Sequence, residues 1–93
     1  MKMNFNKTNI LSVPANKPIL YQLDTAGGNP NYIGVAKRGR SHKRLCDHLP
    51  SGASPVPAKT LKIRRFSSIA EAKVAEKRAI KSKQPKYNIR LKK

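Results

Sequence analysis

The chain has 93 residues, and 21 Lys and Arg against 4 Asp and Glu give it a formal net charge of +17. This length supports one small hydrophobic core and excludes a second independently folding domain. No apolar run is long enough to span a membrane, and the first residues lack the apolar segment and cleavage site of a secretory signal. The single cysteine excludes an internal disulfide and suits a reducing compartment. We therefore expect an intracellular protein of the cytoplasm or nucleoid.

The positive charge is concentrated toward the end of the chain. It is +2 over residues 1–36, +4 over 37–48, zero over 49–58 and +11 over 59–93. Such a chain needs an external counter-charge, and nucleic acid is the commonest large polyanion in cells. An anionic membrane is the rival partner, but it would require a helix with a bulky apolar face, and the long helix expected here has an Ala-rich one. The composition therefore predicts a nucleic-acid partner and no membrane.

The first segment in chain order is poor in structural signals. Residues 1–17 are Asn-rich and weakly periodic, which predicts an N-terminal arm with a short strand near Ile10 to Val13. Residues 18–93 are then expected to form the folded domain.

The next segment predicts a hairpin and a short helix. Apolar and aromatic residues fill 18–24 and return in 31–37, with Gly27 and Gly28 suited to the turn between them. Residues 40–49 contain neither Gly nor Pro and are followed directly by Pro50, which predicts a short helix.

The second half of the chain predicts a loop, a strand and a long helix. Residues 50–58 hold three prolines, and 59–66 alternate apolar with basic residues in the period of a half-buried strand. Ser68 followed by Glu71 matches a capping box for a helix that Pro85 ends. The tail after Pro85 is expected to be a short edge strand. These elements predict an α+β fold, with a small three-stranded antiparallel sheet flanked by helices.

A carboxylate on the inward face of the long helix is the most informative local feature. At 100° per residue, Glu76 falls in the middle of an apolar stripe, whereas Glu71 lies outside and is explained by its capping role. A carboxylate in that position requires a cation or a metal ion as partner. The pattern leaves a structural ion pair and a metal ligand both open. The apolar stripe consists of Ile69, Ala72, Ala75, Ala79 and Ile80.

Two side chains of the short helix could share a phosphate. Arg44 and His48 are spaced i,i+4, so they project side by side, and they combine planar phosphate donors with a group that titrates near neutral pH. A solvated basic face is the alternative. A zinc site from His42, Cys46 and His48 is disfavoured, because Cys46 and His48 point apart on a helix and no fourth ligand completes the set.

The small number of acidic residues limits the metal chemistry. Two-metal phosphoryl-transfer sites need several converging carboxylates, and this chain has four in all. A single Mg²⁺ held by one carboxylate, water and substrate phosphate remains compatible with the sequence.

Four short segments in this order resemble the GIY-YIG nuclease family. They are PILY ending at Tyr21, YIG at 32–34, RLCDH at 44–48 and AEKRAIKSKQPKYN at 75–88. The resemblance covers about residues 18–88, and the Arg-x-x-x-His spacing looks most like the restriction-endonuclease branch. It implies a small antiparallel sheet with helices around it and hydrolysis of DNA phosphodiesters by water. The implied catalytic residues are Tyr21, Tyr32, Arg44, His48, Glu76 and Asn88.

The resemblance implies how the proton would be transferred. Tyr21 and Tyr32 would line the site from adjacent strands, and His48 would take part in proton transfer. Of these residues we expect Tyr21 to act as the general base, with His48 assisting. A phenol can act in this way only if its pKa is lowered, which a metal ion and basic surroundings would favour. Tyr32 would orient the water or the phosphate.

The remaining implied roles concern the phosphate and the metal. Arg44 would bind the scissile phosphate, Glu76 would hold one Mg²⁺ or Mn²⁺ ion, and Asn88 would complete the site. One chain offers one such site, so cutting both strands of a duplex would require a homodimer or two encounters. The basic residues expected to contact the DNA backbone are Lys37, Arg38, Arg40, Lys62, Arg64, Arg65, Lys73, Lys77 and Arg78.

The sequence is therefore compatible with two functions. The first is a metal-dependent GIY-YIG endonuclease acting on DNA. The second is a non-catalytic basic protein that binds nucleic acid, either a degenerate member of the family or a ribosomal-type binder. Glu76 favours the enzyme, because a carboxylate on the binding face would repel phosphate unless a cation lay between them.

Overall fold

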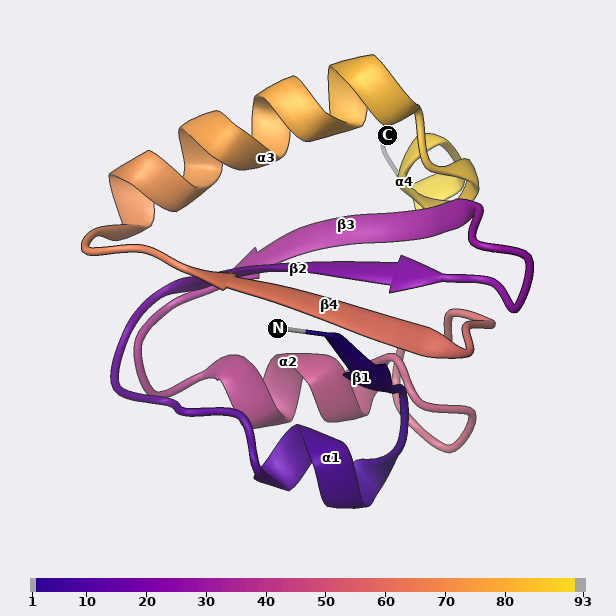
Figure 1. Ribbon diagram of the computed structural model, residues 1–93, viewed down its shortest axis with the longest axis horizontal. Coiled ribbons are helices and arrows are strands. Elements are labelled where there is room, and N and C mark those ends of the chain that lie inside the picture. The colour runs from indigo at the N-terminus through magenta and orange to yellow at the C-terminus, as the bar shows by residue number, and fades with distance from the viewer. Residues whose placement is uncertain (1, 92–93) are drawn as a thin grey trace.

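The fold is a four-stranded antiparallel sheet with helices on both faces (Figure 1). The computed structural model describes residues 2–91, and their side chains as far as residue 88. Within the described residues no helix is both long and apolar enough to cross a membrane. The elements in chain order are β1 (Lys2–Asn4), α1 (Lys7–Leu11), β2 (Ile19–Asp24), β3 (Pro30–Ala36), α2 (Ser41–Asp47), β4 (Thr60–Arg65), α3 (Ile69–Lys83) and α4 (Lys86–Leu91).

Strand β2 is central and pairs on both sides. The strand order is β1-β4-β2-β3, and Tyr21 lies opposite Gly34 on one side and Ile63 on the other. The expected hairpin is therefore present, with Gly28 at φ +87° in its turn. The expected sheet of three strands is wrong by one strand, because β1 adds to the free edge of β4, with Lys2 opposite Lys62.

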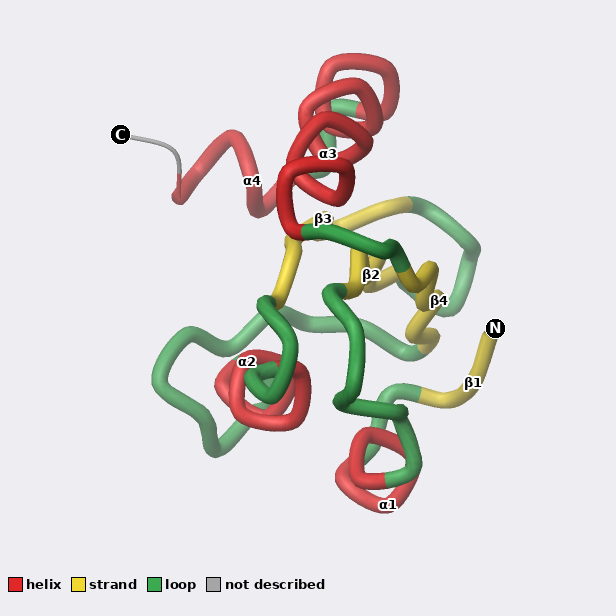
Figure 2. Tube along the Cα trace, turned by 90° about the vertical axis from the view of Figure 1, so that its left-hand side faces the viewer, coloured by secondary structure: helices red, strands yellow, loops and turns green. Residues whose placement is uncertain are grey.

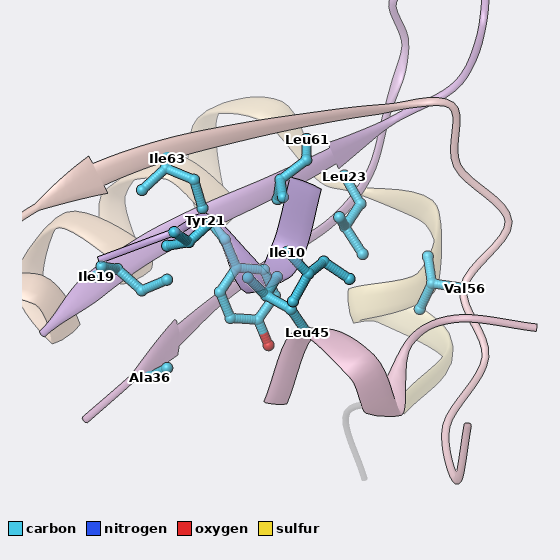
Figure 3. Packing of buried hydrophobic residues seen from close by; sticks show 10 residues of the cluster. Ile10, Ile19, Tyr21, Leu23, Ala36, Leu45, Val56, Leu61 and Ile63 are labelled. Carbon is cyan, nitrogen blue, oxygen red and sulfur yellow. The ribbon is translucent and has the colours of Figure 1, made fainter. Parts of the chain in front are cut away.

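The helices divide between the two faces of the sheet (Figures 1 and 2). Helices α1 and α2 lie below the sheet in Figure 1, and α3 lies above β2 and β3. The main core fills the space between the sheet and α1 and α2. Figure 3 shows the Tyr21 ring within this core. Its buried members are Ile10, Val13, Ile19, Tyr21, Leu23, Ala36, Leu45, Val56, Leu61 and Ile63.

Residues 2–17 pack on this core, although their sequence predicted an arm. The strand expected near Ile10 to Val13 is wrong, since Ile10 lies in α1 and the strand of this segment is β1. Asn6 accepts a hydrogen bond from the backbone of Asn9 and so caps α1. The side chain of Ile10 is fully buried, as is that of Val13 to within 2 %. In this segment, the Asn6 cap and two buried apolar side chains, Ile10 and Val13, are the structural signals in place of a periodic pattern.

The end of the chain also differs from its prediction. Helix α3 begins at the Ser68 cap as expected and ends at Gln84, which adopts a left-handed conformation with φ +46°. After the buried Pro85 the chain forms α4, so an edge strand there is wrong; residues 92–93 lie outside the described part. Helix α4 packs against β3.

The packing of α1 leads to a prediction about stability. Ile10→Ala should lower the free energy of unfolding by about 2–5 kcal/mol, because it leaves a cavity in the core. Leu11→Ala is the matched control, since Leu11 is 55 % exposed and its loss should cost no more than about 0.5 kcal/mol. Urea unfolding followed by circular dichroism measures both. Equal effects would show that the N-terminal segment does not contribute to the core.

Candidate active site

Two tyrosines and a histidine form one cluster between the sheet and α2. Tyr21 comes from β2, Tyr32 from β3, and His48 is the C-cap of α2. The ring centroid of His48 lies 4.6 Å from that of Tyr32 and 5.7 Å from that of Tyr21. The two tyrosine rings are 6.0 Å apart. The structure thus brings together three of the residues that the motifs indicated.

Hydrogen bonds fix the orientation of His48. Its Nδ1 lies 2.9 Å from the carbonyl oxygen of Ser54, and its Nε2 lies 2.9 Å from the Tyr21 hydroxyl. A carbonyl oxygen can only accept, so Nδ1 carries the proton and Nε2 accepts from the phenol. Burial lowers the pKa of His48 below its ordinary value of 6.5. His48 is therefore a neutral base that points at Tyr21.

The proline-rich loop holds His48 in this orientation. Its backbone returns to the end of α2, where Ser54 donates to the carbonyl of Asp47 and Val56 donates to that of His48. Gly52 lies so close to the end of α2 that a Cβ would meet the carbonyl oxygens of Cys46 and Asp47. The sequence does not indicate the role of Ser54, because every residue type has a backbone carbonyl.

Gly34 gives the two tyrosines their space. A Cβ at this position would lie 2.6 Å from the Tyr21 hydroxyl oxygen and 2.9 Å from the Tyr32 ring, closer than real Cβ atoms approach. The φ of Gly34 is not positive, so its backbone conformation does not require a glycine. The glycine of the YIG segment is required because the two tyrosine rings leave no room for a side chain.

Burial controls the acidity of both phenols. It is the largest cause that raises the pKa of Tyr21 above its ordinary value, and this side chain has no exposed surface. Burial also raises the pKa of the partly exposed Tyr32, and so does the charge of Glu76, while the charge of Arg44 lowers it. The protein environment therefore raises the pKa of Tyr21, whereas a general base was expected to have a lowered pKa.

Arg44 lies on the exposed side of α2, beside a hollow of about 390 Å³. Its charge lowers the pKa of Tyr21, Tyr32 and Glu76, so it acts on all three groups. The hollow carries three further cationic side chains and therefore has the charge needed to receive a phosphate. These are Lys37, Arg40 and Lys73.

Glu76 is half-buried on the inward stripe of α3, as predicted. Burial raises the pKa of its carboxyl, and Arg44 and Lys73 lower it. Among the side chains that the structure describes, neither Lys nor Arg forms an ion pair with Glu76, which speaks against a purely structural salt bridge. The other three carboxylates are engaged: Asp24 with Lys62, Asp47 with Lys43, and Glu71 with Ser67.

Asn88 binds the edge of the sheet. Its side-chain oxygen accepts from the backbone N–H of Ile33 at 2.6 Å, and its Nδ2 donates to the carbonyl oxygen of Ile33 at 2.8 Å. Both halves of the amide are therefore used on the residue next to Tyr32. In this structure Asn88 positions β3 through its backbone.

The nine predicted DNA contacts fall into separate groups. Lys37, Arg40 and Lys73 line the hollow beside Arg44. Lys62 and Arg64 line a second hollow on the other flank of α3. The remaining four, Arg38, Arg65, Lys77 and Arg78, are exposed and line neither hollow.

The zinc alternative finds no support in the described residues. His42 Nε2 lies 2.6 Å from the carbonyl oxygen of Val13, and both nitrogens of His48 are engaged as described above. Within residues 2–91 no three His, Cys, Asp or Glu side chains are grouped so as to hold a metal ion.

A neutral imidazole hydrogen-bonded to a phenol, together with an arginine whose charge acts on that phenol, is compatible with acid–base chemistry on a phosphate ester. No protein-family model and no curated protein matches the chain. The chain does match solved structures of the GIY-YIG N-terminal endonuclease domain of UvrC from Thermotoga maritima. A variant of that domain bound to its catalytic divalent cation is 30 % identical, with a TM-score of 0.67 over 87 % of this chain and 91 % of that one.

The magnesium-bound form of the same domain gives 28 % identity and a TM-score of 0.66, over 87 % of this chain and 92 % of that one. Fold, site and these comparisons agree with the resemblance carried by the sequence motifs. The chain belongs to the GIY-YIG endonuclease family.

The close approach at Gly34 leads to a second prediction. Gly34→Ala should destabilise the fold by about 1–3 kcal/mol, because the added methyl displaces one of the tyrosine rings. It should also abolish any cleavage that depends on them. Gly27→Ala is the control, since its nearest atoms lie at 3.8 Å and its φ is not positive. Thermal unfolding and plasmid cleavage check this, and a stable, active Gly34→Ala protein would contradict it.

Proposed function

We propose that this chain is an endonuclease that hydrolyses phosphodiester bonds in DNA, with water as nucleophile and one divalent cation. The observation that carries the proposal is the neutral His48, which is hydrogen-bonded to Tyr21, a phenol whose pKa is lowered by the charge of Arg44. Family membership supports the same conclusion.

Glu76 is the residue that would hold the cation. It is half-buried, without an ion pair among the described side chains, and is the one acidic residue whose charge acts on both Tyr21 and Tyr32. One carboxylate, completed by water and substrate phosphate, suits Mg²⁺ or Mn²⁺. The related UvrC domain is bound to magnesium. The ion would supply positive charge against the phosphoryl oxygens.

The burial of the two phenols suggests an order for proton transfer. Tyr21 has no exposed surface, so it cannot receive a proton directly from solvent water. Tyr32 is partly exposed, and the centroid of its ring lies 6.0 Å from that of Tyr21. We therefore assign Tyr32 as the group that takes the proton from the attacking water. Tyr21 relays a proton from Tyr32 to His48, which differs from the expected assignment of Tyr21 as the general base.

Arg44 and its cationic neighbours provide the complementary electrostatic part. A guanidinium offers planar donors to two phosphate oxygens, and its charge stabilises the negative charge that develops during hydrolysis. Lys37, Arg40 and Lys73 line the same hollow and would hold adjacent phosphates. Asn88 acts through Ile33 as a positioning residue for Tyr32.

The decisive test separates binding from hydrolysis. Glu76→Gln should lower the rate of nicking of supercoiled plasmid in Mg²⁺ by about 10²-fold or more, while DNA binding stays equal or tightens because a negative charge is lost. Glu71→Gln is the matched control, because Glu71 lies on the exposed side of α3 and serves the helix cap. Equal loss of binding and cleavage in Glu76→Gln would remove its metal-binding role.

The same assay addresses the alternative function and the number of chains. Retained DNA binding without cleavage in any divalent metal ion would identify a non-catalytic binder. Because one chain carries one site, we expect nicked circles to appear before linear DNA, and linear product that rises with protein concentration would indicate a homodimer. Arg44→Ala controls for contaminating nuclease.

The protonation state of His48 predicts the pH dependence. Because burial lowers its pKa, His48 is neutral above pH 6.5, and the cleavage rate should fall only as the pH drops through a midpoint below that value. His48→Gln should lower the rate and remove this acidic limb. His42→Gln should retain the limb, since His42 contacts Val13 and lies outside the cluster. An unchanged limb in His48→Gln would exclude His48 as the final base.

A further inference from the structure

A second hollow, of about 350 Å³, lies on the other flank of α3. It opens between this helix and the face of β2, β4 and β1 that points away from the main core, and it shares no lining residue with the hollow beside Arg44. Figure 2 shows that α3 lies over β2 and β3, while β4 and β1 extend beyond it. We call this hollow the β4 groove. Its lining includes Lys2, Gln22, Lys62, Arg64, Ala79 and Lys83.

A buried polar network forms the floor of the β4 groove. Gln22 is only 6 % exposed, and its side chain donates to Asp24 and accepts from Lys83, both at 2.8 Å. Asp24, 1 % exposed, also pairs with Lys62 at 3.1 Å. Two lysines from distant parts of the chain, in β4 and α3, are thus held at the groove by fixed partners.

The charge of the β4 groove is unbalanced. Lys2 lies directly opposite Lys62 in the sheet, and like charges in such a cross-strand pair are destabilising. Asp24 offers one negative charge against four cations that line the groove. The Arg64 guanidinium lies over the Phe66 ring, 5.0 Å from its centroid, which restricts its position. The arrangement lacks anionic counter-charge, which a phosphate chain would supply.

We propose that the β4 groove is a second binding site for the phosphodiester backbone, away from the phosphate that is cut. The choice of nucleic acid as ligand rests on the proposed function. Helix α3 separates the two sites, so the groove holds a stretch of the bound nucleic acid on the far flank of that helix. Recognition is by charge and independent of base sequence.

The proposal predicts the salt dependence of binding. Without divalent ions, so that no cleavage occurs, the affinity of the full chain for a duplex is measured at several salt concentrations. Each lost phosphate contact reduces the slope of log K against log salt by about 0.9. The triple variant Lys2→Gln, Arg64→Gln, Lys83→Gln should therefore reduce the slope by about 2–3.

A matched triple variant controls for the loss of net charge. Lys7, Lys17 and Lys81 are exposed and line neither hollow, so replacing each with Gln removes the same charge elsewhere. This variant should reduce the slope by less than about 1, because the bound phosphates remain engaged. Equal slopes for the two triple variants would overturn the proposal.

A measurement on the unmodified protein removes any dependence on how the variants fold. In an NMR titration with the duplex, amide signals at Lys62, Arg64 and Lys83 should shift as a set distinct from those around Arg44. Signals that stay in place at the groove while those near Arg44 shift would overturn the proposal. The salt dependence and the NMR titration measure binding alone, whereas plasmid nicking measures hydrolysis. The proposal for the β4 groove and the proposed endonuclease function can therefore be refuted independently.

Discussion

Burial of the Tyr21 phenol is the constraint on which the rest of the site depends. A hydroxyl without exposed surface requires a hydrogen-bond partner, and His48 provides it from the end of α2. His48 accepts this bond only while its other nitrogen donates, so the carbonyl of Ser54 is equally necessary. Gly34 leaves room for the ring on the neighbouring strand. One buried hydroxyl thus connects the sheet, α2 and the proline-rich loop, and the same connection keeps His48 neutral and hydrogen-bonded to Tyr21.

Much of this arrangement follows from the sequence, where patterns are local. Alternation in β4, the cap at Ser68 and the glycines of the hairpin indicate elements that the structure contains. The position of Glu76 on an inward stripe follows from helical periodicity alone. The family motifs then identify Tyr21, Tyr32 and His48, which the fold brings together.

The parts that could not be predicted depend on contacts between distant segments. Strand β1 exists because β4 has a free edge, and nothing in residues 2–4 announces that partner. The tail becomes α4, and Asn88 then binds the backbone of Ile33, 55 positions away in sequence. Ser54 acts through its carbonyl, which every residue type possesses. Burial of Tyr21 also opposes the lowered pKa expected from charge alone, because desolvation outweighs the nearby Arg44.

Helix α3 explains how a chain of charge +17 can keep one half-buried carboxylate without an ion pair to any described Lys or Arg side chain. Ala72 and Ala75 let the helix lie close to the sheet, so Glu76 is half-buried between the helix and the strands. Arg44 and Lys73, which line the first hollow, lower the pKa of its carboxyl, but neither forms an ion pair with it among the described side chains. On the opposite flank Asp24 is occupied by Lys62, and the surplus charge faces outward. The two flanks of one helix thus differ in their charge. On one flank a half-buried carboxylate interacts with Arg44 and Lys73 without an ion pair among the described side chains, and on the other four cations line a groove whose one nearby carboxylate is already paired.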